Sequence, residues 1–150
     1  MTDHDAERAI RDNLLDYCEF LDEKRIDDFI GIFTEDVVFE EAGETVGRDA
    51  LRKKVLKLLN VFERLSHHLS NVRIRLTGPD TAESTAYIYA YQKLAKNGEV
   101  LEIWGRYVSE HRCEDGRWRI SKRTVMQQGW RGGFKHLEIM EVPLATLPES

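Results

Sequence analysis

The sequence is poor in the residues that mark disulfide-rich secreted proteins and membrane proteins. Its 150 residues include only two cysteines, Cys18 and Cys113, which are too few for a disulfide framework. No apolar run approaches the roughly 20 residues that a membrane-crossing helix requires. The first residues, MTDHDAERAI, are acidic and lack the basic-then-apolar order of a secretory signal. We therefore expect a cytoplasmic protein with no membrane partner.

Positive charge is also in short supply. The chain has 22 Lys and Arg against 27 Asp and Glu, for a net charge of −5. Because Lys and Arg supply most nucleic-acid affinity by displacing counterions, we expect no nucleic-acid partner. The one basic concentration is Arg112, Arg117, Arg119, Lys122 and Arg123. Acidic residues interleave with it, so we interpret it as the solvated face of a hairpin, with Arg123 a candidate anchor for an acidic substrate group.

Motifs for metals and cofactors are missing as well. No HxH, HExxH or CxxC spacing occurs, and the adjacent His67 and His68 cannot readily converge on one ion. The glycines of GWRGGF at 129–134 lack the strand-to-helix setting of a phosphate-binding loop. We expect neither a metal nor an organic cofactor, so that any chemistry would depend on side chains alone.

The residues that are present predict a single domain covering 1–150 that begins with helices. A first amphipathic helix is predicted over 5–21, because apolar residues recur there at steps of three and four. A second, shorter helical stripe runs from Ile26 to Phe33, and a third runs from Leu51 to Leu65. The apolar positions of the first helix are Ala6, Ile10, Leu14, Tyr17, Cys18 and Leu21.

Strands are predicted to follow the helices. Two short strands flank Gly43 within 36–47, and an alternating strand covers 72–76. Three longer strands, 82–96, 100–113 and 117–128, are separated by Asn-Gly and Asp-Gly pairs, which are strong hairpin signals. This order predicts an α+β fold in which a cone-shaped, curved antiparallel sheet packs on three N-terminal helices and encloses an apolar cavity for a small molecule. The tail from Gly129 onward either closes over the cavity mouth or crosses to a partner subunit.

Several motifs carry a resemblance to a known family. VGRDALR opens the third helix, HxxSN opens the meander, and WGRYVSEHRCEDGRWRISKR closes it. With the order of elements, these resemble the SnoaL-like branch of the nuclear transport factor two-like superfamily over roughly residues 5–128. The resemblance implies a cystatin-like α+β roll that self-associates through its open outer sheet face. It says less about function, because this fold serves dehydratases, isomerases, cyclases, dehydrohalogenases and non-catalytic subunits.

The resemblance also implies site residues. Members that eliminate water or hydrogen halide carry an aspartate near the end of the first helix and a histidine entering the third strand. Here these positions match Asp22 and His67, and Tyr17 matches a tyrosine of the bile-acid dehydratases. A neutral imidazole can accept a proton from carbon, while a carboxylate on its other nitrogen fixes the tautomer and stabilises the imidazolium. A tyrosine can donate to a leaving or carbonyl oxygen.

The residue pattern leaves alternatives open at these positions. Extending simple alternation backward from Val72 places His68 on the apolar face and His67 opposite, so only a bulge or bend would turn His67 inward. His67 is then either a general base or a helix-capping residue. Asp22 is either its buried partner or a surface residue of the DEKR turn, and Tyr17 also fits core packing.

Candidate substrate-binding residues beside Arg123 are His68, Tyr89 and Trp104. Tyr89 belongs to a face of three alternating tyrosines, and the alternation does not say whether this face or the small-residue face lines the cavity. We expect Trp104 and Trp118 in the core or the pocket wall.

We therefore expect a cofactor-independent, dehydratase-like lyase or an isomerase acting on a steroid-, terpenoid- or polyketide-like molecule, and forming a homo-oligomer. The segment GRYVSEHRCEDGRWRISKR also resembles the small, non-catalytic subunit of aromatic-ring-hydroxylating dioxygenases, which is the main alternative. A small-molecule-binding protein without turnover is a third.

Overall fold

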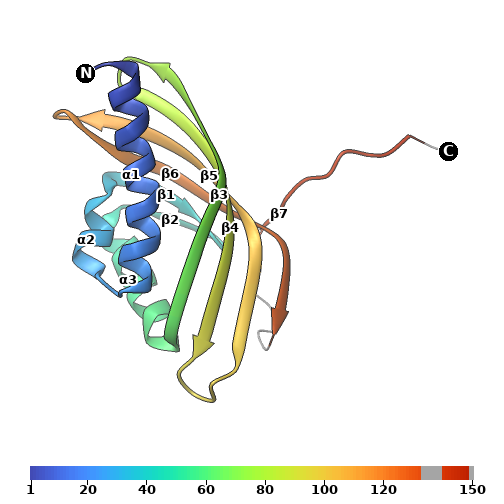
Figure 1. Ribbon diagram of the computed structural model, residues 1–150. Coiled ribbons are helices and arrows are strands. Elements are labelled where there is room, and N and C mark those ends of the chain that lie inside the picture. The colour runs from blue at the N-terminus through green and yellow to red at the C-terminus, as the bar shows by residue number, and fades with distance from the viewer. Residues whose placement is uncertain (133–139, 149–150) are drawn as a thin grey trace.

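The computed structural model describes residues 1–132 and 140–148, in which two helices, a short hairpin and a third helix precede the long strands, as predicted (Figure 1). Within these residues the helices are α1 (Asp3–Asp22), α2 (Ile26–Gly31) and α3 (Arg48–Val61). The strands are β1 (Phe33–Glu40), β2 (Glu44–Val46), β3 (Phe62–Gly78), β4 (Thr81–Leu94), β5 (Val100–Glu114), β6 (Arg117–Gly132) and β7 (Met140–Glu141). The long strands curve around the helices, which confirms the α+β class.

Helix α1 forms because its sequence satisfies both its N-terminus and its inner face. Thr2 and Asp5 make a reciprocal capping box, in which the Asp5 N–H donates to the Thr2 hydroxyl at 3.2 Å and the Thr2 N–H donates to the Asp5 carboxylate at 3.0 Å. All six predicted apolar positions, from Ala6 to Leu21, are buried. The helix ends at Asp22, and the chain leaves it through Lys24, which has a left-handed φ of 58°.

The second and third helices end earlier than the apolar spacing predicts. Helix α2 ends at Gly31, before Phe33, and α3 ends at Val61. The ammonium of Lys24 donates to the carbonyl oxygens of Leu59 (2.9 Å) and Phe62, and so satisfies the end of α3. From Phe62 onward the chain pairs with β4 instead. The predicted extension to Leu65 is wrong, because buried apolar residues three apart suit a strand with a bend as well as a helix.

The sheet is mixed rather than wholly antiparallel. Strands β3, β4, β5 and β6 form the predicted antiparallel meander, and β1 pairs with β2 as predicted. However, β1 and β7 each pair with β6 in parallel, giving the order β2-β1-β6-β5-β4-β3 for the main path. The turn between β5 and β6 has positive φ at both Asp115 (51°) and Gly116 (72°), as the Asp-Gly signal predicts.

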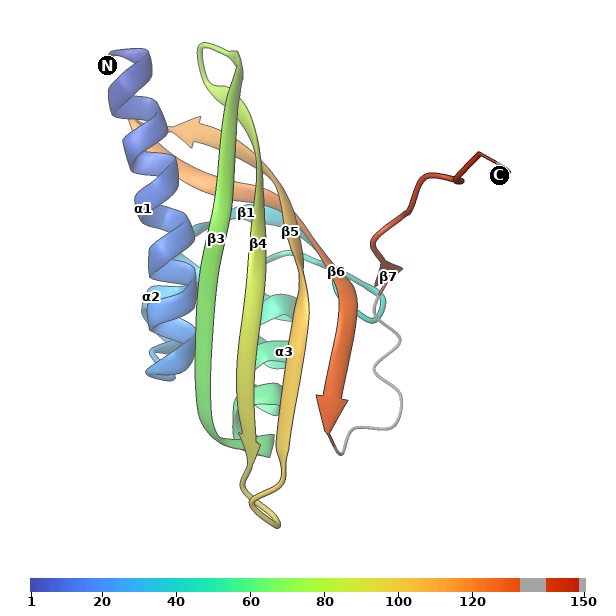
Figure 2. The ribbon, with the colours of Figure 1, turned by 45° about the vertical axis from the view of Figure 1, so that its right-hand side comes forward.

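The tail beyond β6 is only partly described, since 133–139 lie outside the described residues. Val142 is buried, whereas Leu144 and Leu147 are exposed on a segment that leads away from the sheet (Figure 2). The prediction that the tail closes the cavity or reaches a partner subunit therefore falls partly outside the described residues. In the described part of the chain, no helix combines the length and apolarity needed to cross a lipid bilayer.

Candidate active site

His67 and Asp22 meet where the end of α1 packs against β3. Nδ1 of His67 lies 2.5 Å from Oδ1 of Asp22, and the backbone N–H of His67 donates to Oδ2 of the same carboxylate at 2.8 Å. The imidazole side chain is 5% exposed and the carboxylate side chain 24%. The carboxylate thus engages both the ring and the backbone of one residue, which fixes the ring's orientation. No hydrogen bond from a described residue occupies Nε2.

A bulge in β3 turns His67 toward the helices. Asn71 and Val72 together oppose the single residue Ala86 of β4. Asn71 has a left-handed φ of 50°, which asparagine adopts more readily than most residues. The extra residue switches the inward positions from odd numbers, including His67, to even numbers, including Val72. The alternation from Val72 was therefore misleading, and the histidine on the inner face is His67.

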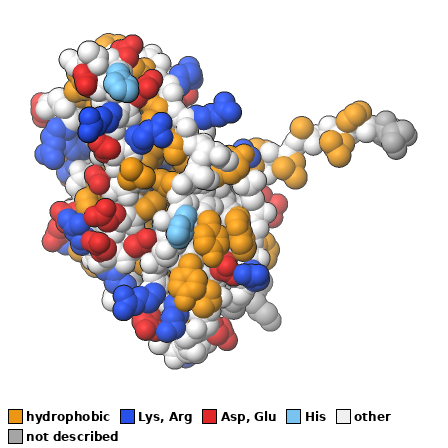
Figure 3. Space-filling view, viewed as in Figure 1, with side chains coloured by type: hydrophobic (Ala, Val, Ile, Leu, Met, Phe, Trp, Pro, Cys, Tyr) orange, Lys and Arg blue, Asp and Glu red, His pale blue; other side chains and the backbone are white. Residues whose placement is uncertain are grey.

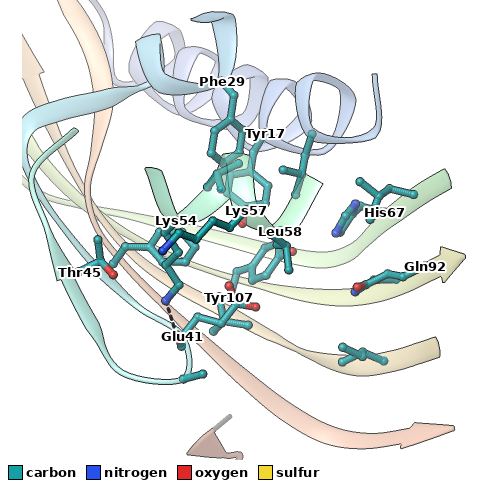
Figure 4. Close-up of a pocket in the computed structure, with 18 of the residues that line it drawn as sticks. Tyr17, Phe29, Glu41, Thr45, Lys54, Lys57, Leu58, His67, Gln92 and Tyr107 are labelled. Carbon is teal, nitrogen blue, oxygen red and sulfur yellow. Dashed lines mark hydrogen bonds between the residues drawn. The ribbon is translucent and has the colours of Figure 1, made fainter. Parts of the chain in front are cut away.

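The imidazole faces a cavity of about 740 Å³ between the helices and the sheet (Figure 4). This volume suits a small organic molecule. Its walls are largely apolar. Its mouth opens between the β1–β2 hairpin and α3, which carry the exposed lining residues. These are Ala42, Glu44, Val46, Ala50, Lys53, Lys57 and Val61. Among residues 1–132 and 140–148, no three His, Cys, Asp or Glu side chains are placed to hold a metal ion.

Tyr17 forms part of the cavity wall on α1. It is 3% exposed, and its ring packs against Phe29 and Tyr107 with centroids 5.0 and 5.1 Å apart. Burial raises the pKa of the Tyr17 phenol well above its ordinary value. A phenol that holds its proton so firmly can donate a hydrogen bond but is a poor source of protons.

Arg123 is buried behind these tyrosines and does not lie on a solvated hairpin face. It is fully buried, with its guanidinium carbon 4.3 Å from the ring centre of Tyr17 and 4.4 Å from that of Tyr107. Its Nε donates to the hydroxyl of Ser109 at 2.8 Å, and both Nη atoms lack a hydrogen-bond partner. Each desolvated cation–π contact is worth about 2 kcal/mol. Arg123 is not among the residues that line the cavity, which corrects its expected role as a substrate anchor.

A second bulge explains the position of Arg123. Ser121 is an extra residue of β6, because Ile120 pairs with His111 while Lys122 pairs with the adjacent Glu110. The inward positions of β6 therefore change from even to odd numbers at Ser121. A basic residue that simple alternation assigns to the surface is placed in the core.

His68, Tyr89 and Trp104 lie on the outer face of the sheet, away from the cavity. Their rings pack against one another in that order at tilted angles of 45° and 44°, with centroids 5.6 and 5.4 Å apart. Nε2 of His68 lies 2.9 Å from the hydroxyl of Ser66, and Tyr89 donates to Glu102 at 2.7 Å. Figure 3 shows hydrophobic side chains gathered beside a histidine over this part of the sheet, with charged groups around them.

The expectation that these three residues line the substrate pocket is therefore wrong. The small residues of β4, such as Ala86 and Ala90, face the helices and leave room for the cavity, so the alternating tyrosines must face outward. Trp104 is 41% exposed, whereas Trp118 is buried as predicted.

Glu41 is a cavity residue that the sequence analysis did not identify. It follows β1 in the tight turn that contains Gly43, and such a turn predicts solvent-facing acids. The structure instead places it in the cavity lining, where Lys54 donates to its backbone carbonyl (Figure 4). Burial raises the pKa of the Glu41 carboxyl, and the nearby charges of Lys54, His67 and Arg123 offset only part of that effect.

A separate buried pair, His111 and Ser84, lies outside the cavity lining. His111 is 1% exposed, its Nε2 is 2.7 Å from the Ser84 hydroxyl, and its Nδ1 has no partner. Burial, and then the positive charge of Arg123, lower the pKa of His111 to about 3. The ring is therefore neutral at ordinary pH, and it has no access to a ligand in the cavity.

Comparison with known proteins shows a family match. A family model described as a SnoaL-like domain matches residues 2–124. The matched range includes every site residue named above, from Tyr17 to Arg123.

Three solved structures share the architecture. A protein of Novosphingobium aromaticivorans DSM 12444, described provisionally as a scytalone dehydratase, has a TM-score of 0.88 and 23% identity, covering 94% of this chain and 95% of that chain. A protein of Novosphingobium aromaticivorans described provisionally as an aromatic ring hydroxylase has a TM-score of 0.82 and 25% identity, covering 89% of this chain and 96% of that chain. A hexachlorocyclohexane dehydrochlorinase, LinA type 2, has a TM-score of 0.80 and 18% identity, covering 92% of this chain and 93% of that chain.

Proposed function

The chain belongs to the SnoaL-like domain family, within the nuclear transport factor two-like fold, and from this membership and the geometry of its cavity we propose that it is a lyase or isomerase. It abstracts a proton from carbon in a small, largely apolar molecule without a cofactor. His67 is the general base, Asp22 orients it, and Tyr17 donates a hydrogen bond to an oxygen of the substrate.

One observation carries this proposal. The side chain of His67 is almost wholly buried, contacts Asp22 at 2.5 Å through Nδ1, and lines a cavity of about 740 Å³. A surface histidine that caps a helix needs neither a partly buried carboxylate partner nor a cavity. Because a carboxylate accepts hydrogen bonds, Nδ1 carries the ring proton and Nε2 keeps the lone pair that can remove a proton from carbon.

The same geometry explains how the pair would work. When Nε2 takes a proton, the ring becomes a cation, and Asp22 stabilises that charge without moving because both of its oxygens are already engaged. The apolar walls weaken solvent screening and so strengthen this interaction. A well-placed general base contributes roughly 10²–10⁴-fold to a rate.

Proteins described as elimination enzymes share this fold. Two structures with the same fold carry the descriptions dehydratase and dehydrochlorinase. Their identities of 23% and 18% make them evidence of fold alone, so the choice of reaction for this chain depends on its own residues.

The experiment uses 5-nitrobenzisoxazole, whose ring opens when a base removes its carbon-bound proton, so that no physiological substrate is needed. We expect His67→Gln and Asp22→Asn each to slow turnover at least about a hundredfold. The matched controls are His68→Gln, on the outer face, and Asp12→Asn, on the exposed side of α1, and both should retain the wild-type rate. Circular dichroism verifies folding. Turnover that survives both site changes contradicts the proposal.

A second candidate is a non-catalytic subunit of an aromatic-ring hydroxylase. It is favoured by the 25%-identical structure described as an aromatic ring hydroxylase and by the outer sheet face around Tyr89 and the exposed Trp104. Such a subunit would bind a catalytic chain and tolerate loss of His67. Wild-type turnover of 5-nitrobenzisoxazole that depends on His67 would exclude it, and retention of small ligands without turnover would favour a binding protein.

A further inference from the structure

Glu41 is an acidic side chain in a mainly apolar cavity, without a partner of its own. Neither a hydrogen bond nor an ion pair to a described residue involves its carboxyl group, although its backbone is held at both ends. Its N–H donates to the carbonyl of Gly43 at 3.1 Å, and its carbonyl accepts from Lys54. The turn therefore fixes the residue while leaving the carboxyl group free to interact with whatever occupies the cavity.

The surroundings of Glu41 bring together the other groups of the site. Figure 4 shows Glu41 and His67 on different sides of the same cavity. The charged and titratable groups that act on Glu41 come from five elements and are Lys54 of α3, His67 of β3, Arg123 of β6, Tyr17 of α1 and Tyr107 of β5. Burial outweighs the cations among them, so the pKa of the carboxyl is raised and the group keeps its proton to higher pH than a solvated glutamate does.

We propose that Glu41 is the general acid of this site, which protonates the departing oxygen of the substrate while His67 removes a proton from the adjacent carbon. This assignment rests on the function proposed above. In the step, the C–H electron pair forms the new double bond and the C–O bond breaks. The oxygen takes its proton from Glu41, so a hydroxyl leaves as water. His67 ends protonated and Glu41 ionised, and proton exchange with solvent restores both.

The other candidates for this role are less suited to it. Tyr17 lies in the wall, but burial raises the pKa of its phenol so far that it holds an oxygen better than it protonates one. The ammonium of Lys54 is engaged with the carbonyl of Glu41. Of these three groups, Glu41 is the one that combines access to the cavity with a carboxyl proton and no side-chain partner among the described residues.

The assignment selects a substrate class. Halide is a good leaving group and needs no proton, whereas hydroxide leaves readily only as water. An acid opposite the base therefore favours dehydration over loss of hydrogen halide. The expected substrate is an apolar molecule with a hydroxyl group on the carbon next to an acidic C–H bond.

The test compares two probes that differ only in their leaving group. Unsubstituted benzisoxazole opens to a poor phenoxide leaving group that benefits from a proton, whereas 5-nitrobenzisoxazole opens to a good one that does not. We expect Glu41→Gln to slow the unsubstituted probe at least about thirtyfold and the nitro probe less than about threefold. The matched control is Glu35→Gln, in β1, which precedes Glu41, with a side chain that is 82% exposed, and it should change neither rate.

A pH profile gives a second readout. With the unsubstituted probe, the wild-type rate should fall on the alkaline side as Glu41 ionises, and Glu41→Gln should remove that decline. Equal effects of Glu41→Gln on both probes, or no effect on either, would overturn the assignment while leaving the role of His67 intact. Failure of the wild type to open the nitro probe would overturn the proposed function and this assignment together.

Discussion

His67 and His68 are adjacent in the chain and identical in type, yet they lie on opposite faces of the sheet. His67 faces the helices, where a carboxylate holds its ring and a cavity lies in front of it. His68 faces outward, beside Ser66 and over the ring of Tyr89. The proposed role of His67 therefore depends on the partner and the surroundings of its ring, and one backbone irregularity decides which histidine obtains them.

The residues with proposed catalytic roles lie on the inner face of the sheet, whereas the residues of the outer face make ordinary surface contacts. On the inner face His67, Tyr17 and Glu41 all line one cavity. On the outer face the charged neighbours of Tyr89 and Trp104 are Glu102 and Arg131, whose pairing is of the exposed kind that contributes little. Substitutions on the inner face should therefore alter turnover, whereas substitutions on the outer face should leave it nearly unchanged.

The largest effect should come from exchanging the two histidines. Asn71→Val straightens the bulge without shortening the strand, because a β-branched residue disfavours the left-handed φ of 50°. A regular strand of unchanged length that keeps Val72 inward turns His67 outward and His68 inward. We expect turnover of 5-nitrobenzisoxazole to fall roughly a thousandfold, because the ring that enters is not aligned with Asp22. Asn71→Gly, which permits the same left-handed φ, should keep the rate. An Asn71→Val variant with wild-type turnover would show that the bulge does not select the base.

A third histidine on a strand, His111, extends the comparison to a ring that faces inward but does not line the cavity. Its folded pKa of about 3 lies below the unfolded value near 6.5, so the unfolded chain binds more protons between these pH values. The free energy of unfolding keeps this contribution above about pH 6.5 and decreases as the pH is lowered, by about 3 kcal/mol at pH 4. Urea unfolding at several pH values measures this loss. In His111→Gln, the free energy of unfolding should depend less steeply on pH in the acid range. Equal slopes for variant and wild type would contradict the burial argument.

A smaller effect should separate two tyrosines on opposite faces. Tyr17→Phe removes a hydroxyl from the cavity wall while keeping the ring on Arg123, so we expect turnover of unsubstituted benzisoxazole to fall about tenfold. Tyr89→Phe removes the outer hydroxyl that donates to Glu102, and the rate should stay within about twofold. If both variants behave alike, the distinction between the faces has no catalytic meaning.

Much of this fold could be predicted from the sequence, because periodicity reports burial wherever elements are regular. The inner face of α1 and the meander with its Asp-Gly turn were predicted on that basis and are confirmed. The predicted curved sheet is mostly antiparallel, as expected. Its parallel pairing of β1 with β6 was not predicted, because the two strands lie far apart in the sequence and local patterns do not report such pairings. Self-association, which the family resemblance implies, stays a prediction.

The site was harder to predict, because its residues lie where periodicity breaks. Bulges at Asn71 and Ser121 reverse which residues face inward, and each reversal buries a residue that alternation assigned outward, His67 in one case and Arg123 in the other. The resemblance to a family identified His67 despite this, but no comparable signal existed for Arg123. Glu41 escaped notice because a glutamate before a turn is usually solvated, and only the three-dimensional arrangement shows the cavity beside it.

Long-range nitrogen–proton NMR of the histidine rings tests the central claim most directly, because it locates the ring proton of His67. The predicted result is a neutral ring with the proton on Nδ1, toward Asp22, and a lone pair on Nε2, toward the cavity, with the preference for this tautomer lost in Asp22→Asn. A proton on Nε2 in the wild-type protein would contradict the account, since that ring could not accept a proton from a molecule in the cavity.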